Sequence, residues 1–390
     1  MADPVNTQLA YDLLIKGGKV VDPSQGLSGI MDVAMTAGKV AAIQPEIPAV
    51  NARETLDATG MIVTPGLIDL HVHAYWGVSC YGMEPDIGNI SRGVTTAVDA
   101  GSAGARTFPG FRRYVMERAD TRLYALINIS SMGMIAPHIR EVDDMRWLDV
   151  KEAVRCALDN RDLIIGVKCR PSNTRVIHDD IEIMKRTTDV AEGIGGFVMV
   201  HVKTTTHSLD VLTAMLRPGD VVTHAFHGAV EGGILDKDGK VIEGLRADQK
   251  RGVIFDVGHG SGSFSFAVAQ KALEQGFDIG NISSDLWNDN FDKKVFDQVT
   301  TLSKFLNMGM TLEQVVSRST DITARIMKMK GRIGTLRPGA EGDASILAMD
   351  EGDFTFHDSG NKVLKGTKKL RHAKTVKGGK VYRPWLKPTG

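Results

Sequence analysis

The chain has 390 residues, of which 42% are hydrophobic and 24% are charged, as in ordinary soluble globular proteins. Lysine plus arginine number 47 and aspartate plus glutamate also number 47, so the formal net charge is zero. A neutral chain gives no electrostatic case for nucleic acid or an anionic membrane, and no apolar stretch approaches the roughly 18 residues of a membrane span. We therefore expect a small-molecule substrate and no nucleic-acid or membrane partner, while a homo-oligomer stays open.

The cysteines and the first residues bear on the cellular compartment. Cys80, Cys156 and Cys169 are too few and too scattered for a disulfide framework or a CxxC zinc site. Their odd number favours free thiols in a reducing compartment. The first ten residues carry an acidic residue and no basic segment, which is unlike a secretory signal. We therefore expect a cytoplasmic protein.

The first sixty or so residues predict a small antiparallel β unit. Short apolar runs are separated by glycine or proline, and one break is expected at Gly17-Gly18. The predicted strands are 12–16, 19–22, 33–35 and 40–43.

From about residue 62 the pattern changes to buried apolar strands that alternate with helical segments. The predicted strands are 66–73, 94–100, 123–130, 163–169, 197–202, 221–226, 253–258 and 279–285. The predicted helices are 148–160, 180–192, 207–216, 264–275, 293–308 and 311–329. Strand–helix alternation predicts a parallel sheet, and eight such units over roughly 275 residues fit a (β/α)8 TIM barrel.

After Gly331 the β pattern returns, at 344–348 and 375–381. Each terminal β segment is too short to form a stable domain alone, so we expect the two to pair. The predicted fold class is therefore α/β, with a (β/α)8 TIM barrel over residues 63–338. Residues 1–62 and 339–390 together are predicted to form a small β-sandwich domain.

The first predicted barrel strand ends in a pair of histidines, His71 and His73. Residues two apart on a strand point to the same face, so the two imidazoles can hold one metal ion. Two ordinary surface or core histidines are the alternative explanation for an isolated pair.

Metal-ligating residue types recur at the ends of other predicted strands. The further residues are Lys168, His201, His224 and Asp285. Each has an ordinary explanation by itself: a hydrogen-bonded histidine, a solvated lysine, or an aspartate that caps the next helix. Barrel enzymes place their active sites at the C-terminal mouth, where these strand ends form one ring. The joint pattern therefore favours a metal site.

Two motifs resemble those of the amidohydrolase superfamily. Residues Val63 to His73 resemble its opening motif, and Gly334 to Ala344 resemble its return into the β unit. The resemblance extends over nearly the whole chain and is strongest to the dihydroorotase-like and deacetylase-like branch. It implies a metal-dependent hydrolase that acts on C–N or ester bonds.

The resemblance also implies a ligand set for two divalent metal ions, with Zn²⁺ as the expected metal. The ligands are His71, His73 and Asp285 for one ion, His201 and His224 for the other, and Lys168 between them. An ordinary lysine, with a reference pKa of about 10.4, is protonated and cannot ligate a metal. We therefore expect a CO2-derived carbamate on Lys168, whose oxygen atoms suit zinc together with imidazole.

The leading hypothesis is a deacetylase-like hydrolase that cleaves an amide or ester acyl bond of a small carboxylate-bearing substrate. A metal-bridging hydroxide would attack the carbonyl, with Asp285 as general acid and base. The alternatives are a cyclic-amide hydrolase of the dihydroorotase or hydantoinase type, then a mononuclear deaminase, then a scaffold without catalysis. Dihydroorotases carry an arginine soon after the histidine pair, whereas His73 is followed here by Ala74-Tyr75-Trp76-Gly77.

Three residues are predicted to contact the substrate. Arg170 lies two positions beyond Lys168, and its planar fork suits a carboxylate, although a rim arginine paired with a surface acid would look the same. Lys203 stands in the same relation to His201. His259 lies in a glycine-rich loop that either brings backbone N–H groups to an anion or forms a tight turn. The segment 130–138 is expected to cover the mouth, with methionines as an adaptable apolar lining.

Overall fold

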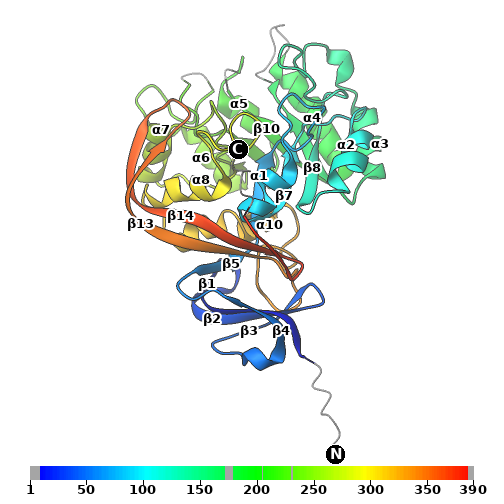
Figure 1. Ribbon diagram of the computed structural model, residues 1–390. Coiled ribbons are helices and arrows are strands. Elements are labelled where there is room, and N and C mark those ends of the chain that lie inside the picture. Colours follow the sequence, from blue (N-terminus) through cyan, green and yellow to red (C-terminus); the bar gives the residue numbers. More distant parts are fainter. Residues whose placement is uncertain (1–8, 172–178, 204, 230–231, 385–390) are drawn as a thin grey trace, which may run out of the picture.

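The computed structural model describes residues 9–171, 179–203, 205–229 and 232–384 (Figure 1). The prediction about the first ten residues therefore lies almost entirely outside the described residues. Within the described ranges, no helix is long and apolar enough to cross a lipid bilayer.

The centre of the molecule is a curled sheet of seven parallel strands, in the order β12-β11-β10-β9-β8-β7-β6 (Figure 1). Its strands are β6 (Leu67–Val72), β7 (Val94–Ala100), β8 (Arg122–Asn128), β9 (Ile164–Cys169), β10 (Phe197–His201), β11 (Val221–Thr223) and β12 (Ile254–Phe255). Every residue of β6 and β7 is buried, as expected for parallel strands covered on both faces. All seven lie within or almost within the predicted ranges.

The eighth barrel position differs from the prediction, because no regular strand forms at 279–285. Instead, Asn281 and Leu286 make isolated parallel bridges to Asp256 and Val72, the neighbours on either side. The amide of Asp285 also donates to the carbonyl of His71 at 2.8 Å. The left-handed backbone of Asp285, with φ of 51°, interrupts a regular ladder here. This irregular segment nevertheless closes the ring.

Helices cover the outside of the barrel. They are α1 (Pro85–Gly88), α2 (Phe108–Phe111), α3 (Val150–Asp159), α4 (Asp180–Ile194), α5 (Leu209–Thr213), α6 (Glu243–Arg251), α7 (Phe266–Glu274), α8 (Gln298–Leu306), α9 (Leu312–Ser317) and α10 (Asp321–Ile326). The predicted helix 311–329 is divided into α9 and α10. Helix α6 was not predicted because it is highly polar and buries only Leu245 and Asp248.

A mixed eight-stranded sheet joins the two ends of the chain. Its strands are β1 (Tyr11–Asp22), β2 (Leu27–Thr36), β3 (Lys39–Gln44), β4 (Ala52–Asp57), β5 (Ile62–Pro65), β13 (Ala344–His357), β14 (Val363–Lys377) and β15 (Lys380–Tyr382). The N-terminal and C-terminal segments meet where β5 pairs antiparallel with β13. The predicted pairing of the two segments is confirmed, while their sandwich form and the domain boundaries stay predictions.

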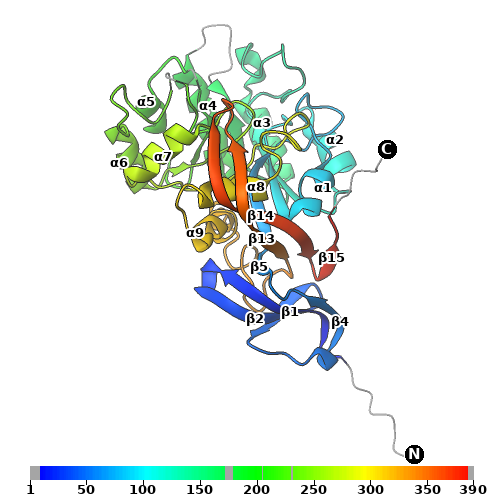
Figure 2. The same ribbon diagram turned by 60° about the vertical axis from the view of Figure 1, so that its left-hand side comes forward.

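Two details of this sheet correct the prediction. Strand β1 continues through Gly17-Gly18, where a bulge with φ of 74° at Gly17 shifts the register instead of ending the strand. The β13–β14 hairpin is also much longer than predicted, since charged residues at its outer positions obscure the alternation. It extends from the mixed sheet along the side of the barrel, next to α8 (Figure 2).

Candidate active site

The predicted ring of ligands lies in one pocket at the C-terminal mouth of the barrel. The pocket is lined by His71, His73, Tyr81, Met134, Lys168, Arg170, His201, Lys203, His224, Ser261, Gly262, Ser263, Asp285 and Trp287. The structure therefore brings together six side chains that are separated by up to 214 positions in the sequence. This convergence follows from the parallel strands, whose carboxyl ends meet at one edge.

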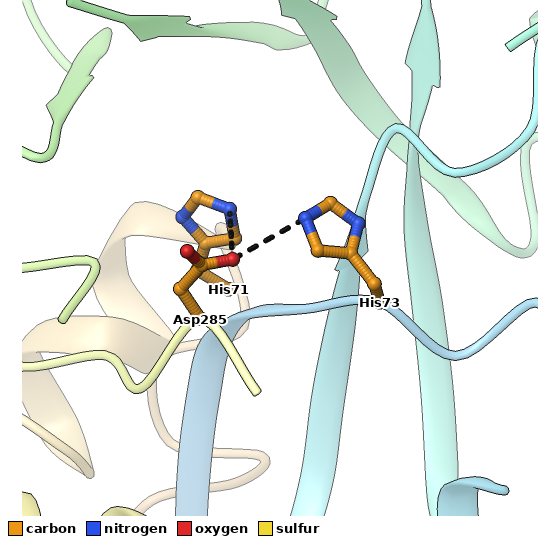
Figure 3. Close-up of side chains that lie close together, drawn as sticks. All are labelled: His71, His73 and Asp285. Carbon is orange, nitrogen blue, oxygen red and sulfur yellow. Dashed lines mark ion pairs between the residues drawn. The ribbon is translucent and has the colours of Figure 1, made fainter. Parts of the chain in front are cut away.

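His71, His73 and Asp285 form the tightest group (Figure 3). Nε2 of His71 and Nε2 of His73 each lie 3.3 Å from Oδ1 of Asp285. One donor atom from each of the three residues lies within 4.8 Å of the others, which is compatible with a single metal ion. The two histidines share a face because they are two residues apart at the end of β6.

Lys168, His201 and His224 complete the ring on the other side of His71. Lys168 Nζ lies 3.1 Å from His71 Nε2, and the ring centroids of His71 and His224 are 5.0 Å apart. The rings of His201 and His224 pack edge to face, with centroids 4.2 Å apart. His224 follows β11 with a left-handed φ of 64°, which turns its ring back into the pocket.

In three of these histidines, the ring nitrogen Nδ1 has a hydrogen-bond partner. The pairs are His71 Nδ1 with Thr223 Oγ1 at 2.8 Å, His73 Nδ1 with Ser102 Oγ at 3.0 Å, and His224 Nδ1 with the Gly258 carbonyl at 2.6 Å. Such partners fix the orientation of each ring and leave Nε2 to face the centre, as metal-ligating histidines require.

A buried carboxylate supports this arrangement behind His71. Asp256 accepts hydrogen bonds from Thr223 Oγ1 at 2.7 Å, from Ser283 Oγ at 2.7 Å and from Asn281 Nδ2 at 2.6 Å. Burial nevertheless raises the pKa of Asp256 above its ordinary value, against the effect of these hydrogen bonds. Because Thr223 Oγ1 donates its one proton to Asp256, it accepts from His71 Nδ1–H, and this leaves the Nε2 lone pair free.

The protonation states of the ring fit a metal site. Burial lowers the pKa of His224 to about 3 and that of His201 far below its ordinary value, so both imidazoles are neutral. Burial also lowers the pKa of Lys168 to about 8. Burial alone would raise the pKa of Asp285, but the hydrogen bond with His73 and the nearby charges bring it below its ordinary value. Neutral imidazoles, an ionised carboxylate and an easily deprotonated lysine are a suitable donor set for divalent metal ions.

Arg170 lines the pocket beside this ring, which is compatible both with a substrate contact and with an arginine paired with an acid. Its Nη1 lies 3.2 Å from Glu141 Oε1, so it is indeed paired with an acid. The guanidinium carbon lies 5.7 Å from the ring centroid of Tyr81. Its Nε is buried and finds no acceptor in the described part of the chain. The substrate contact of Arg170 stays a prediction.

Of the other two predicted substrate contacts, Lys203 lines the pocket and His259 does not. Lys203 lines the pocket and donates from Nζ to the Gly262 carbonyl at 2.9 Å. His259 is completely buried and is absent from the described lining of the pocket. Its Nε2 lies 2.8 Å from Lys304 Nζ instead, and its Nδ1 lies 3.0 Å from the Gly260 carbonyl. A substrate contact by His259 stays a prediction, but the structure engages both of its ring nitrogens elsewhere.

The loop around His259 still contributes to the pocket, through Ser261, Gly262 and Ser263. Gly260 has a left-handed φ of 50°, and a Cβ atom at this position would collide with the carboxylate of Asp285. The glycine is therefore needed for the loop to approach the site this closely.

Sequence reasoning missed several residues that shape the pocket. Tyr81 packs against Trp287, with ring centroids 5.1 Å apart, and both line the mouth. Glu141 was not predicted to hold Arg170. The aromatic-rich segment after His73 was the available signal for Tyr81, whereas nothing local pointed to Glu141. Met134 lines the pocket as the predicted loop over the mouth requires.

Comparisons with individual known proteins place the chain in a family, although no protein-family model matches it. A deacetylase from Agrobacterium fabrum is 32% identical over 368 residues, covering 93% of this chain and 89% of the relative. A deacetylase from Enterococcus faecalis is 32% identical over 379 residues, covering 95% and 99%. The chain belongs to the amidohydrolase superfamily.

Solved structures agree with this assignment. A crystal structure described as an adenine deaminase superposes with a TM-score of 0.88 at 31% identity, covering 96% of this chain and all of the other. One described as a dihydroorotase superposes with a TM-score of 0.86 at 30% identity, covering 95% and 97%. This amidohydrolase is a hydrolase of the deacetylase-like and dihydroorotase-like branch.

Proposed function

We propose that this amidohydrolase is a binuclear zinc enzyme that removes an acyl group from a small carboxylate-bearing substrate. The observation that carries the proposal is the convergence of one complete donor set in a single buried pocket. The donors are His71, His73, Lys168, His201, His224 and Asp285. The deacetylases matched over most of the chain support acyl-bond hydrolysis.

The metal ions would be held by two groups of these residues. His71, His73 and Asp285 would hold one ion, and His201 and His224 would hold the other. Lys168 would join them as a carbamate, and its lowered pKa favours the neutral amine that reacts with CO2. When bound, such a pair of ions supplies an activated water molecule and polarises the substrate carbonyl.

Asp285 would move the proton of the reaction. Its Oδ1 faces Nε2 of His71 and of His73, and one of its carboxylate oxygens would accept a proton from the attacking water. Its lowered pKa keeps the carboxylate ionised and ready to accept that proton. The same oxygen then delivers the proton to the departing amine or alcohol, so one residue serves as base and acid in turn.

Arg170 would orient the substrate through its carboxylate. Arg170 lines the pocket, and Glu141 and Tyr81 hold its guanidinium in place. Lys203 would add a second positive charge to the lining of the same pocket. A small-molecule substrate with one carboxylate fits this arrangement of two cations above the catalytic ring.

A cyclic-amide hydrolase is the second candidate. A solved structure described as a dihydroorotase is 30% identical and covers 95% of the chain, which favours this candidate. The same donor set and the same proton transfer by Asp285 would open a cyclic amide. The absence of an arginine directly after His73 weighs against dihydroorotate itself.

A substrate panel with parallel metal analysis would test the proposal. Zinc-loaded protein is assayed against N-acetyl and O-acetyl derivatives of small carboxylic acids, and against dihydroorotate and hydantoins. We expect about two metal ions per chain and the highest kcat/KM on an acylated acid. Preferential ring opening would establish the second candidate instead. One metal ion per chain with an unmodified Lys168 would overturn both and favour a mononuclear deaminase.

A further inference from the structure

A second pocket is lined by residues of α8, of the segment before it and of the β13–β14 hairpin. The hairpin lies beside α8 on the outside of the barrel (Figure 2). It encloses about 490 Å³ and shares no lining residue with the active-site pocket. It is lined by Lys293, Lys294, Phe296, Thr300, Lys304, Phe354, Thr355, Phe356, His357, Asn361 and Lys369. Nothing in the hydrolytic mechanism uses these residues.

The lining of this second pocket is strongly positive. It contains four lysines and no carboxylate. Lys293 pairs weakly with Asp289, at 4.0 Å. Within the described ranges, Nζ of Lys294, of Lys304 and of Lys369 makes no salt bridge. Neighbouring cations raise the local potential and favour an anion.

Part of the wall of this pocket is aromatic. Phe296, Phe354 and Phe356 line it, and Phe296 has 42% of its surface exposed. Lys369 Nζ lies 6.0 Å from the ring centroid of Phe296, so charge and aromatic surface lie next to each other. A ligand with a flat apolar body and one anionic group would match both features of the lining.

Lys304 lies at the base of the pocket and is 1% exposed. Its Nζ lies 2.8 Å from His259 Nε2 and donates to the Lys294 carbonyl at 2.9 Å. An ammonium group carries three hydrogens, so one is left without a protein acceptor in the described part of the chain. Burial lowers the pKa of Lys304 to about 7, although Asp358 and Asp297 act in the opposite direction. A bound anion would supply the direct ion pair that this buried group does not make within the described ranges.

We propose that this second pocket binds a small aromatic anion, a carboxylate or a phosphate ester, and that its occupancy is transmitted to the active site through Lys304 and His259. The anionic group contacts Lys294, Lys304 and Lys369, and the ring stacks on the phenylalanine wall.

The connection to the active site is a continuous set of hydrogen bonds. His259 belongs to the loop whose neighbours Ser261 to Ser263 line the active-site pocket. Ser359, at the tip of the hairpin, donates from Oγ to the Gly260 carbonyl at 2.9 Å and accepts from the Ser263 amide at 3.2 Å. An anion that draws Lys304 Nζ into the second pocket weakens its bond to His259. This moves the loop that packs on Asp285.

Binding is tested on full-length, metal-loaded protein by calorimetric titration with phenyl phosphate, benzoate and inorganic phosphate. The variants Lys294→Gln and Lys369→Gln remove cations from the pocket. Lys368→Gln is the matched control, since this exposed lysine lies on the same hairpin outside the lining. We expect each pocket variant to weaken binding roughly tenfold, the effect of one charged hydrogen bond, and the control to leave it unchanged.

The probes distinguish the forms of the ligand. Binding of benzoate alone identifies a carboxylate, binding of phenyl phosphate alone identifies a phosphate ester, and either supports the proposal. Equal binding of all three probes by wild type and pocket variants overturns it, as does the absence of binding. If inorganic phosphate binds as tightly as phenyl phosphate, the phenylalanines do not contribute to binding, and this result contradicts an aromatic ligand.

Kinetics separate this site from the active site. The bound probe should change kcat at saturating substrate in wild type and in Lys368→Gln, and should have no such effect in Lys369→Gln. A probe that raises KM alone, equally in all three proteins, acts by competition in the active site and overturns the coupling.

Discussion

Two buried lysine–histidine pairs in this molecule have the same local chemistry and different surroundings. Lys168 Nζ lies 3.1 Å from His71 Nε2, and Lys304 Nζ lies 2.8 Å from His259 Nε2. Burial lowers the pKa of Lys168 to about 8 and that of Lys304 to about 7. The isolated pair therefore does not define a metal site.

The difference lies in what surrounds each pair. Around Lys168, the side chains of His201, His224 and Asp285 converge on one pocket. Around Lys304 there is a backbone carbonyl, and His259 packs on Phe264 with ring centroids 4.6 Å apart. The number of converging donors, which the parallel strand ends supply only at the barrel mouth, separates a candidate metal centre from a buried cation. The following substitutions test this distinction.

Replacing Lys168 should have the largest effect. Lys168→Ala removes the proposed carbamate bridge, so we expect kcat/KM to fall by more than about 100-fold, since losing even an outer partner of a metal ligand costs roughly 10–100-fold. Added short carboxylic acids should restore part of the activity, because their carboxylate group can take the place of the proposed carbamate. The measurements are metal content and steady-state rates. Full activity with full metal content would contradict the bridge.

Thr223→Val tests the support behind His71. The hydroxyl joins His71 Nδ1 to Asp256, and its loss should weaken metal binding about 10–100-fold. Metal affinity is measured by competition with a chelator. Thr187→Val is the matched control, because this buried hydroxyl donates to a helix carbonyl, that of Ile183, at 2.8 Å and is absent from the described lining of the pocket. Equal metal affinity of the two variants would contradict the prediction that Thr223 holds His71 in place for metal binding.

Arg170→Met tests the substrate side of the pocket. We expect KM for a carboxylate substrate to rise about tenfold or more, since a hydrogen bond to a charged group contributes roughly 1.5–3 kcal/mol. Metal content should stay the same, because Arg170 is not a proposed ligand. An unchanged kcat/KM would remove Arg170 from the substrate site and leave only its pairing with Glu141.

Lys304→Met should have the smallest effect on the metal centre. We expect full metal content, in contrast to Lys168→Ala. The free energy of unfolding should fall by about 1–3 kcal/mol, because His259 Nε2 is left buried without a donor. Urea unfolding and metal analysis provide the measurements. Loss of metal in this variant would show that the two pairs are not independent.

Much of the barrel was predictable, because buried parallel strands are local apolar runs that are easily recognised in a sequence. Strand β7 matches its predicted range of 94–100. The segment near Asp285 was harder, since its left-handed backbone breaks the ladder although its apolar pattern is that of a strand. Helix α6 and the outer part of the β13–β14 hairpin were missed because exposed, charged elements carry weak periodicity.

The sequence by itself determined which residue types stand at the strand ends, and hence the candidate metal ring, because alternation and parallel topology bring such residues to one edge. Tertiary structure alone decided the partners. It paired Arg170 with Glu141 and turned His259 away from the substrate pocket toward Lys304. It also formed the second pocket between α8 and the hairpin. Contacts between distant segments depend on how whole elements pack, and no local pattern encodes that packing.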